Sequence, residues 1–283
     1  MNAIASATID GPSVQQRRDA VLREPRWFPC SGISISNSTA EMLIEEAAIV
    51  RERVDNAGLA LFQLTRPLDT NEFVALAATL GLPERETERS LMDRVTGGII
   101  LNLTPDSTLP LTEDSQPFTP QPLTYHIEGS RRPLGMSPAY LLFQCLECPA
   151  VDRGGQTIVR SISDTLAALA ETTQAVLAST VLNPEATTAP VIYERGNQRT
   201  LNFRDPAPAE FRWQSQYDRA EVVSAFAQLL SAIYDSDATV GIPWREGLLV
   251  VVDNHRWLHA RTSGRVGRRH LQRIRVQSPK GTT

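Results

Sequence analysis

Lysine is almost absent from this 283-residue chain, and cysteine is scarce. Lys280 is the only lysine, so arginine supplies nearly all the positive charge. Arginine can hold a carboxylate through two parallel hydrogen bonds, which lysine cannot do. The three cysteines, Cys30, Cys145 and Cys148, are too few for a disulfide framework. The net charge of −4 gives no reason to expect nucleic acid or an anionic membrane as a partner.

Long apolar runs are also missing. None approaches the roughly 20 residues that cross a bilayer, and residues 1–25 lack the basic start and apolar stretch of a secretory signal. We therefore expect a cytoplasmic protein. A chain of this length can bury a large core as one domain without disulfides. We expect residues 1–24 to form a mobile tail and residues 25–283 to form a single domain.

Cys145 and Cys148 have the CxxC spacing of zinc and redox sites. A zinc site of the ribbon type needs a second pair of cysteines, and only Cys30 remains elsewhere. The two cysteines end an apolar run and precede Pro149. We therefore interpret them as small apolar residues that finish a strand.

Residue periodicity predicts an α+β protein that is mainly β. Helices are expected at 39–57, 70–80, 163–170 and 219–234, with Asp69 capping the second. Strands are expected at 58–64, 97–103, 123–128, 139–145, 156–159, 247–252, 257–261 and 270–276. The segments 84–96, 104–121 and 183–216 show no clear period, and we expect them to be mobile loops that cover a site.

The first chemical signal is the pair His126 and Glu128. On a strand, the period of two places both side chains on one face, roughly 6.6 Å apart. One imidazole, one carboxylate and a distant second histidine can hold three positions of an octahedral iron(II) ion and leave three open. The HxE pattern alone is weak, because it is common on solvated surfaces.

The second signal lies in residues 253–261, after an apolar strand. Asp253 and Asn254 indicate a tight turn. His255 and His259 are four residues apart, a spacing that would pair them on a helix. On a turn followed by a strand they need not coincide, so we expect only one of them to bind metal.

The third signal is Arg273, which follows His259 by fourteen residues. Gly264 and Gly267 allow a hairpin that brings the strand of Arg273 back beside His259. An arginine buried near a metal needs an anion, and a dicarboxylate can provide it. The alternative is a basic edge strand that faces solvent.

Four blocks, taken together, resemble the TauD/TfdA superfamily of Fe(II)/2-oxoglutarate dioxygenases. They are His126-x-Glu128, Gly154-Gly-Gln-Thr157, residues 253–262 and residues 268–273. The glutamate in the first block is similar to the clavaminate synthase branch and argues against the chlorinating subgroup. Residues 58–83 resemble the N-terminal part of the family, so the likeness spans about residues 40–276.

The resemblance implies a double-stranded β-helix, or jelly roll, with flanking helices. It implies that His126, Glu128 and His259 bind iron, and that Thr157 and Arg273 bind 2-oxoglutarate. Arg269 is then expected near the substrate or the 2-oxoglutarate. His255 stands where the family varies and is expected to support the site or the fold.

The implied reaction uses O2 and 2-oxoglutarate, releases succinate and CO2, and hydroxylates an unactivated C–H bond. Desaturation or ring closure can follow from the same chemistry. The resemblance favours a small amino-acid-like or carboxylate substrate, free or carrier-bound, in specialised metabolism. Arg131, Arg204 and Asp205 lie on segments that could line the entrance, and they are candidate substrate residues.

Two other functions remain open at this point. A zinc hydrolase could use His126, Glu128 and His259 to activate water, although Thr157 and Arg273 would then have no role. A non-catalytic binding protein on a β-barrel would tolerate the loss of His126 or Glu128.

Overall fold

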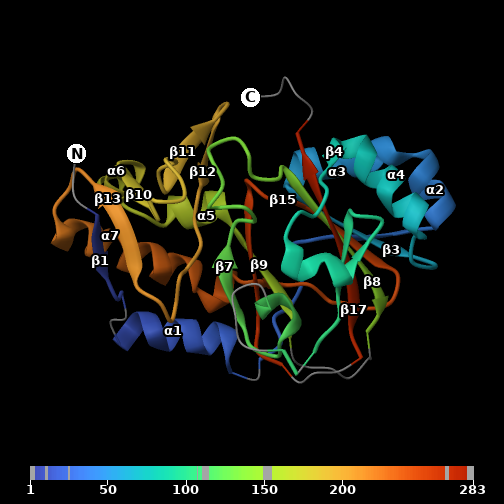
Figure 1. The fold of residues 1–283 in the computed structure, drawn as a ribbon, viewed down its shortest axis with the longest axis horizontal. Coiled ribbons are helices and arrows are strands. Elements are labelled where there is room, and N and C mark those ends of the chain that lie inside the picture. The colour runs from blue at the N-terminus through green and yellow to red at the C-terminus, as the bar shows by residue number, and fades with distance from the viewer. Residues whose placement is uncertain are drawn as a thin grey trace.

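Two facing β-sheets form the centre of the protein in the computed structural model (Figure 1). The structure describes residues 4–9, 12–24, 26–106, 108–109, 115–148, 155–264 and 268–278. Within these residues, the larger sheet has the order β2 (Ile35–Ser38), β3 (Leu59–Leu64), β15 (Leu248–Asp253), β8 (Tyr140–Glu147), β17 (His270–Gln277), β6 (Ile100–Leu103) and β5 (Val95–Thr96), and β4 (Leu82–Pro83) also pairs with β17. The smaller sheet has the order β14 (Val240–Gly241), β9 (Thr157–Ser161), β16 (Trp257–Arg261) and β7 (Leu123–His126).

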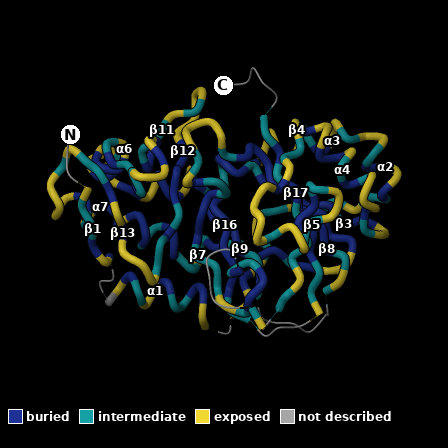
Figure 2. The backbone as a smooth tube through the Cα atoms, in the orientation of Figure 1, coloured by how far each residue is buried: buried dark blue, intermediate teal, exposed yellow. Residues whose placement is uncertain are grey.

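Alternation along the strands divides the core between the two faces of each sheet. On β15, Leu248 and Val250 pack into the space between the sheets, whereas Leu249 and Val251 pack against helices outside. A strand buried on both faces reads as a continuous apolar run, which is why this strand was predictable. Figure 2 shows the same pattern, with buried backbone through the centre and exposed backbone at the rim.

Three helices cover the outer face of the larger sheet: α2 (Ala40–Glu45), α3 (Ala47–Ala57) and α4 (Thr70–Leu80). The helix expected over 39–57 is broken at Glu46, whose ψ of 38° ends α2 before α3 begins. The predicted cap of α4 is confirmed. The Asp69 carboxylate accepts from the backbone of Glu72, and the Glu72 carboxylate accepts from the backbone of Asp69.

A second layer covers the outer face of the smaller sheet. Its helices are α1 (Pro12–Leu22), α5 (Ile162–Ala167), α6 (Glu171–Ala178) and α7 (Arg219–Ile233). Two small sheets belong to the same half of the molecule: β1 (Ala5–Ala7), β13 (Phe211–Ser215) and β10 (Thr180–Leu182) in one, and the hairpin β11 (Ile192–Arg195) and β12 (Gln198–Leu201) in the other. Short 3-10 helices are η1 (Arg89–Arg94), η2 (Gln116–Phe118) and η3 (Ser236–Ala238).

The described part of residues 1–24, which was expected to be a mobile tail, is packed against the rest of the protein. Strand β1 pairs with β13, and Val21 and Leu22 of α1 are buried in the core. The Arg18 side chain forms an ion pair with Asp205 at 2.9 Å, across 187 residues of sequence. Polar composition misled the prediction, because the buried partners of α1 lie far along the chain.

The segment 183–216 is also more regular than expected, since it contains β11, β12 and β13. The segment 84–96 contains η1. Much of 104–121 lies outside the described residues, so the expected mobility of these covering loops stays a prediction. Cys145 lies in β8, which ends at Glu147, in agreement with the strand-end interpretation of the CxxC spacing.

No helix in the described part of the chain is both long enough and apolar enough to cross a membrane.

Candidate metal centre

Strand alternation directs the three predicted metal ligands into the space between the sheets. On β7 and just beyond it, Tyr125 and Ile127 pack against the outer helical layer, so His126 and Glu128 face inward. On β16, Leu258 and Ala260 pack outward in the same way, and His259 therefore faces inward. His259 and His126 are direct partners in the ladder between β16 and β7.

The three side chains converge on one point. One candidate ligand atom from each of His126, Glu128 and His259 lies within 4.8 Å of the others. The two imidazole rings are 4.1 Å apart between centroids. His126 Nδ1 is 2.8 Å from the carbonyl oxygen of Thr124. Since a carbonyl can only accept, Nδ1 carries the proton and Nε2 keeps a lone pair for a metal.

The protonation of the ligands also suits a metal. Burial lowers the pKa of His126 well below its usual value and lowers that of His259 to about 4, so both imidazoles are neutral near pH 7. Burial alone would raise the pKa of Glu128, but the guanidinium groups of Arg273 and Arg275 outweigh it and lower the pKa. Neutral histidine and ionised carboxylate are the forms that bind a metal.

One buried atom supports this fit independently. His259 Nδ1 is buried and has no hydrogen-bond partner among the residues that the structure describes. An unsatisfied buried nitrogen is unusual. A metal bound to Nδ1 would give this atom the partner that it lacks. Two histidines and one carboxylate fit iron(II).

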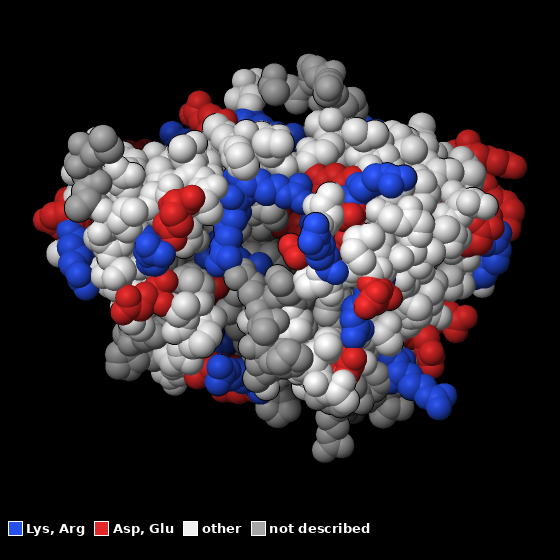
Figure 3. All heavy atoms as spheres, viewed as in Figure 1, with Lys and Arg blue, Asp and Glu red and all other residues white. Residues whose placement is uncertain are grey.

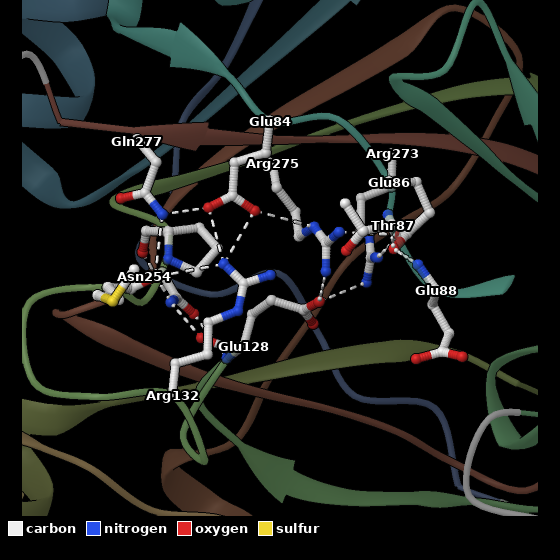
Figure 4. A network of polar contacts seen from close by, with 12 residues as sticks. Glu84, Glu86, Thr87, Glu88, Glu128, Arg132, Asn254, Arg273, Arg275 and Gln277 are labelled. Carbon is white, nitrogen blue, oxygen red and sulfur yellow. Dashed lines mark hydrogen bonds and ion pairs between the residues drawn. The ribbon is translucent and has the colours of Figure 1, made fainter. Parts of the chain in front are cut away.

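A network of charged side chains adjoins Glu128, and Figure 4 shows its members pointing toward one another. Glu128 Oε1 lies 3.0 Å from Arg273 Nη1 and 3.5 Å from Arg275 Nη1. Arg275 also contacts Glu84 at 3.3 Å and Glu86 at 2.9 Å. We call Glu84, Glu86, Glu128, Arg273 and Arg275 the carboxylate wall. It holds Glu128 in place and keeps it ionised.

The residues expected to bind 2-oxoglutarate line the same cavity as the metal ligands. This cavity has a volume of about 360 Å³, and its lining includes Thr157, Arg269 and Arg273. Arg273 Nε is buried with no hydrogen-bond partner in the described part of the chain, so it has a donor available for an anion. Arg269 donates to the carbonyl of Gly155, two residues before Thr157. The expected turn at Gly267 lies outside the described residues.

The chain from residue 31 to residue 275 matches the model of a family described as taurine catabolism dioxygenase TauD, TfdA family. The chain belongs to the TauD/TfdA family. The resemblance inferred from the four sequence blocks is thereby confirmed, together with the dioxygenase class. Among curated protein sequences, no match reaches significance.

Solved structures agree with this membership at the level of the fold. PvcB of Pseudomonas aeruginosa has a TM-score of 0.62 and 20% identity, over 81% of this chain and 79% of PvcB. An asparagine oxygenase solved with Fe(II), 3-hydroxyasparagine and succinate has a TM-score of 0.61 and 17% identity, over 96% and 92%. The non-heme iron oxygenase OrfP, solved with Fe and α-ketoglutaric acid, has a TM-score of 0.65 and 16% identity, over 87% and 94%. The predicted jelly roll with flanking helices is confirmed.

The candidate substrate residues of this TauD/TfdA protein separate into two groups. Arg131 and Arg204 line the metal cavity. They also line a larger cavity of about 760 Å³, so the two cavities meet at these arginines. Figure 3 shows positive and negative side chains around the hollow on this face.

Asp205 does not reach the metal cavity. Its buried carboxylate accepts from Arg18, from the Tyr234 hydroxyl at 2.6 Å and from the Ala207 backbone at 3.1 Å. It therefore joins α1 and α7 to the sheet. Asp205 lines the larger cavity and not the metal cavity, and its assignment as a substrate residue stays a prediction. The sequence carried no signal for this role, because both of its side-chain partners are distant along the chain.

Residues that the sequence analysis did not single out also shape the site. Arg261 is buried and donates to backbone carbonyls of the segment 116–121, a contact that we call the carbonyl anchor. The acceptors are the carbonyls of Gln116, Pro117, Thr119 and Gln121. Arg261 shares the inward parity of His259 on β16, which was the available signal. Glu84 and Glu86 lay in a segment that showed no period.

His255 lies apart from the metal, as expected. It lines a separate cavity of about 240 Å³ with Asp253 and Arg195, and its Nδ1 is 3.3 Å from the Tyr193 hydroxyl. Burial lowers its pKa to about 3, with a smaller contribution from Arg195. His255 is therefore a neutral, buried side chain outside the group of candidate metal ligands.

Proposed function

We propose that the protein is an iron(II)- and 2-oxoglutarate-dependent oxygenase that hydroxylates an unactivated C–H bond of a small amino-acid-like substrate. The observation that carries this proposal is the convergence of His126, Glu128 and His259, facing inward, in a cavity that buried arginines also line. When bound, iron(II) and 2-oxoglutarate supply the oxidising chemistry, which couples loss of CO2 to oxidation of the substrate.

The residues of the chain then have distinct tasks. His126, Glu128 and His259 would hold the metal through one ligand atom each. Arg273, whose buried Nε has no hydrogen-bond partner in the described part of the chain, would hold a carboxylate together with Thr157. Arg269 is the alternative anchor, because its guanidinium donates to the carbonyl of Gly155, two residues before Thr157.

The substrate class follows from the charges of the cavity and from its volume. Glu86 and Glu88 line the metal cavity, as do Arg131 and Arg204, so it offers groups of both signs. A zwitterionic amino acid, free or carrier-bound, would find partners for both of its charged groups. The neighbours support this class, because asparagine oxygenase was solved with a hydroxylated asparagine and OrfP with (3S)-hydroxy-L-Arg. The larger cavity beyond Arg131 and Arg204 would serve as the approach for the substrate.

The test is succinate formation by anaerobically purified protein that receives iron(II), 2-oxoglutarate, O2 and pools of amino acids. We expect iron-dependent turnover that one pool stimulates, and a visible charge-transfer band when iron(II) and 2-oxoglutarate are combined without O2. The Michaelis constant for 2-oxoglutarate in Arg273→Gln and Arg269→Gln then identifies the anchor. Absence of both turnover and the band would refute the proposal and favour a zinc hydrolase.

A further inference from the structure

The side-chain amide of Asn254 forms two hydrogen bonds with the backbone of one candidate metal ligand, Glu128. Its Oδ1 accepts from Glu128 N at 2.9 Å, and its Nδ2 donates to Glu128 O at 3.0 Å. Nδ2 also donates to the carbonyl of Pro138 at 2.9 Å. Asn254 is fully buried, and its backbone N–H is bonded to Ala139 O at 2.9 Å. Both polar atoms of the amide are therefore committed, and Figure 4 shows the contact with Glu128.

These two hydrogen bonds fix the backbone of Glu128, which lies beyond the end of strand β7 and is not held by the sheet. Strand β7 ends at His126, which is its last residue in the ladder with β16. The next residue, Ile127, is tied to Phe203 by one backbone hydrogen bond of 2.9 Å. Gly129 follows with a φ of +73°, so the chain turns away immediately after Glu128. Among the residues that the structure describes, the N–H and the carbonyl of Glu128 both bond to the Asn254 side chain.

The position of Asn254 also links two ligands. It lies in the turn that connects β15 of the larger sheet to β16 of the smaller sheet, five residues before His259. Its side chain spans 126 residues of sequence to reach Glu128. One rigid turn therefore sets both the position of the histidine and the backbone of the carboxylate. Groups that orient metal ligands in this way commonly change metal affinity about 10- to 100-fold when removed.

We propose that Asn254 is a positioning residue that holds Glu128 at the correct distance from His126 and His259 for metal binding. The inference rests on the proposed function only in taking Glu128 as a metal ligand. The competing interpretation is that Asn254 is a buried amide that stabilises the fold and has no specific effect on the metal. A control is needed that removes a similar amide elsewhere.

Gln144 on β8 is that control. It is buried, its Oε1 accepts from Leu68 N at 3.0 Å, and its Nε2 donates to Leu68 O at 3.2 Å. Gln144 therefore forms the same pair of hydrogen bonds with the backbone of Leu68 as Asn254 forms with that of Glu128. Leu68 precedes α4 and is not a candidate metal ligand. Gln144 also bonds to Gln272 at 2.8 Å, so both amides have a third partner.

The experiment measures cobalt(II) affinity, by visible absorption, in the full-length wild type, Asn254→Leu, Asn254→Gln, Gln144→Leu and Glu128→Ala. Urea unfolding of each variant is measured in parallel. Asn254→Gln keeps the amide but lengthens it by one methylene, so it preserves the polar groups if Asn254→Leu fails to fold. Cobalt(II) requires neither O2 nor substrate, and the readout is therefore independent of turnover.

We expect both Asn254 variants to raise the cobalt(II) dissociation constant at least about tenfold and to alter the absorption spectrum. Gln144→Leu should lower the urea midpoint without changing the affinity by more than about threefold. The proposal is overturned if both Asn254 variants, or the one that folds, bind cobalt(II) like wild type, or if Gln144→Leu weakens binding equally. Normal affinity in Glu128→Ala would overturn it together with the ligand assignment. Tight, Glu128-dependent binding without turnover would contradict the proposed function alone.

Discussion

Two arginines that line the metal cavity are held in opposite ways. Arg275, in the carboxylate wall, contacts the side chains of Glu84, Glu86 and Glu128. Arg261, in the carbonyl anchor, donates to four backbone carbonyls. Burial would lower the pKa of Arg275, but the carboxylates raise it. The pKa of Arg261 falls to about 9, because of burial first and Arg269 second.

The difference shows two ways to keep a guanidinium inside a protein. In the carboxylate wall, opposite charges compensate one another, and the arrangement fixes the ionised ligand Glu128. In the carbonyl anchor, the dipoles of backbone carbonyls compensate the charge. The N–H groups of the guanidinium bond to several carbonyls of the segment 116–121, which has no charged side chain. The first arrangement serves the metal and the second shapes the cavity around it.

The largest expected effect separates the two arrangements by function. Glu128→Ala removes a metal ligand, and we expect succinate formation to fall by at least about 1,000-fold. Arg261→Met should leave the cobalt(II) dissociation constant within about threefold of wild type, because the anchor does not contact the metal. If Glu128→Ala and Arg261→Met lost cobalt(II) affinity equally, the carboxylate wall and the carbonyl anchor would not differ in function.

The next effect tests charge compensation. Arg275→Met leaves the three carboxylates of the wall with only Arg132 and Arg273 as cationic partners, and we expect the free energy of unfolding to fall by about 3 kcal/mol. Adding Glu86→Gln to that variant should restore part of the loss, because one uncompensated charge is removed. Urea unfolding measures both. A double variant no more stable than the single one would contradict charge compensation.

A smaller effect tests the geometry of the donors. Arg261→Lys keeps the charge but replaces the planar fork by a point with three donors, so it cannot serve all four carbonyls. We expect it to cost about 2 kcal/mol of unfolding free energy. Arg275→Lys should cost less, because carboxylates can pair with a point charge. The reverse order in urea unfolding would count against the comparison.

The smallest effect at neutral pH comes from His255, which belongs to neither arrangement. Its pKa is about 3 in the folded protein and roughly 6.5 when unfolded. Its contribution to stability is therefore complete above pH 6.5 and is lost as the pH falls toward 3.

Between pH 7 and pH 5, we expect wild type to lose about 2 kcal/mol more unfolding free energy than His255→Gln. His270→Gln is the matched control. Burial lowers the pKa of His270 too, but that side chain is only partly buried, and its effect should be smaller. Parallel pH curves for wild type and His255→Gln would refute the assignment of a buried neutral imidazole.

Much of the site could be predicted because local rules reach it. The period of two placed His126 and Glu128 on one face, and the same parity on β16 directed His259 inward beside Arg261. The strands predicted at 247–252, 257–261 and 270–276 match β15, β16 and β17 for the same reason. The hairpin expected between the last two is wrong, because β16 and β17 belong to different sheets that face each other. By contrast, polar composition over residues 1–24 and 183–216 was a poor guide, since β1, α1 and β13 bury their apolar groups in a core built from segments distant along the chain, α7 among them.

The sequence by itself determined which residues could serve as ligands, and which face of its strand each one occupies. Those features depend on residue type and on backbone geometry over a few positions. Tertiary structure alone decided that Asn254 grips Glu128, that Arg275 pairs with Glu86, and that Asp205 is tied to Arg18. Each of these contacts joins segments more than 100 residues apart. Sheet pairing sets such distances, and no local periodicity encodes them.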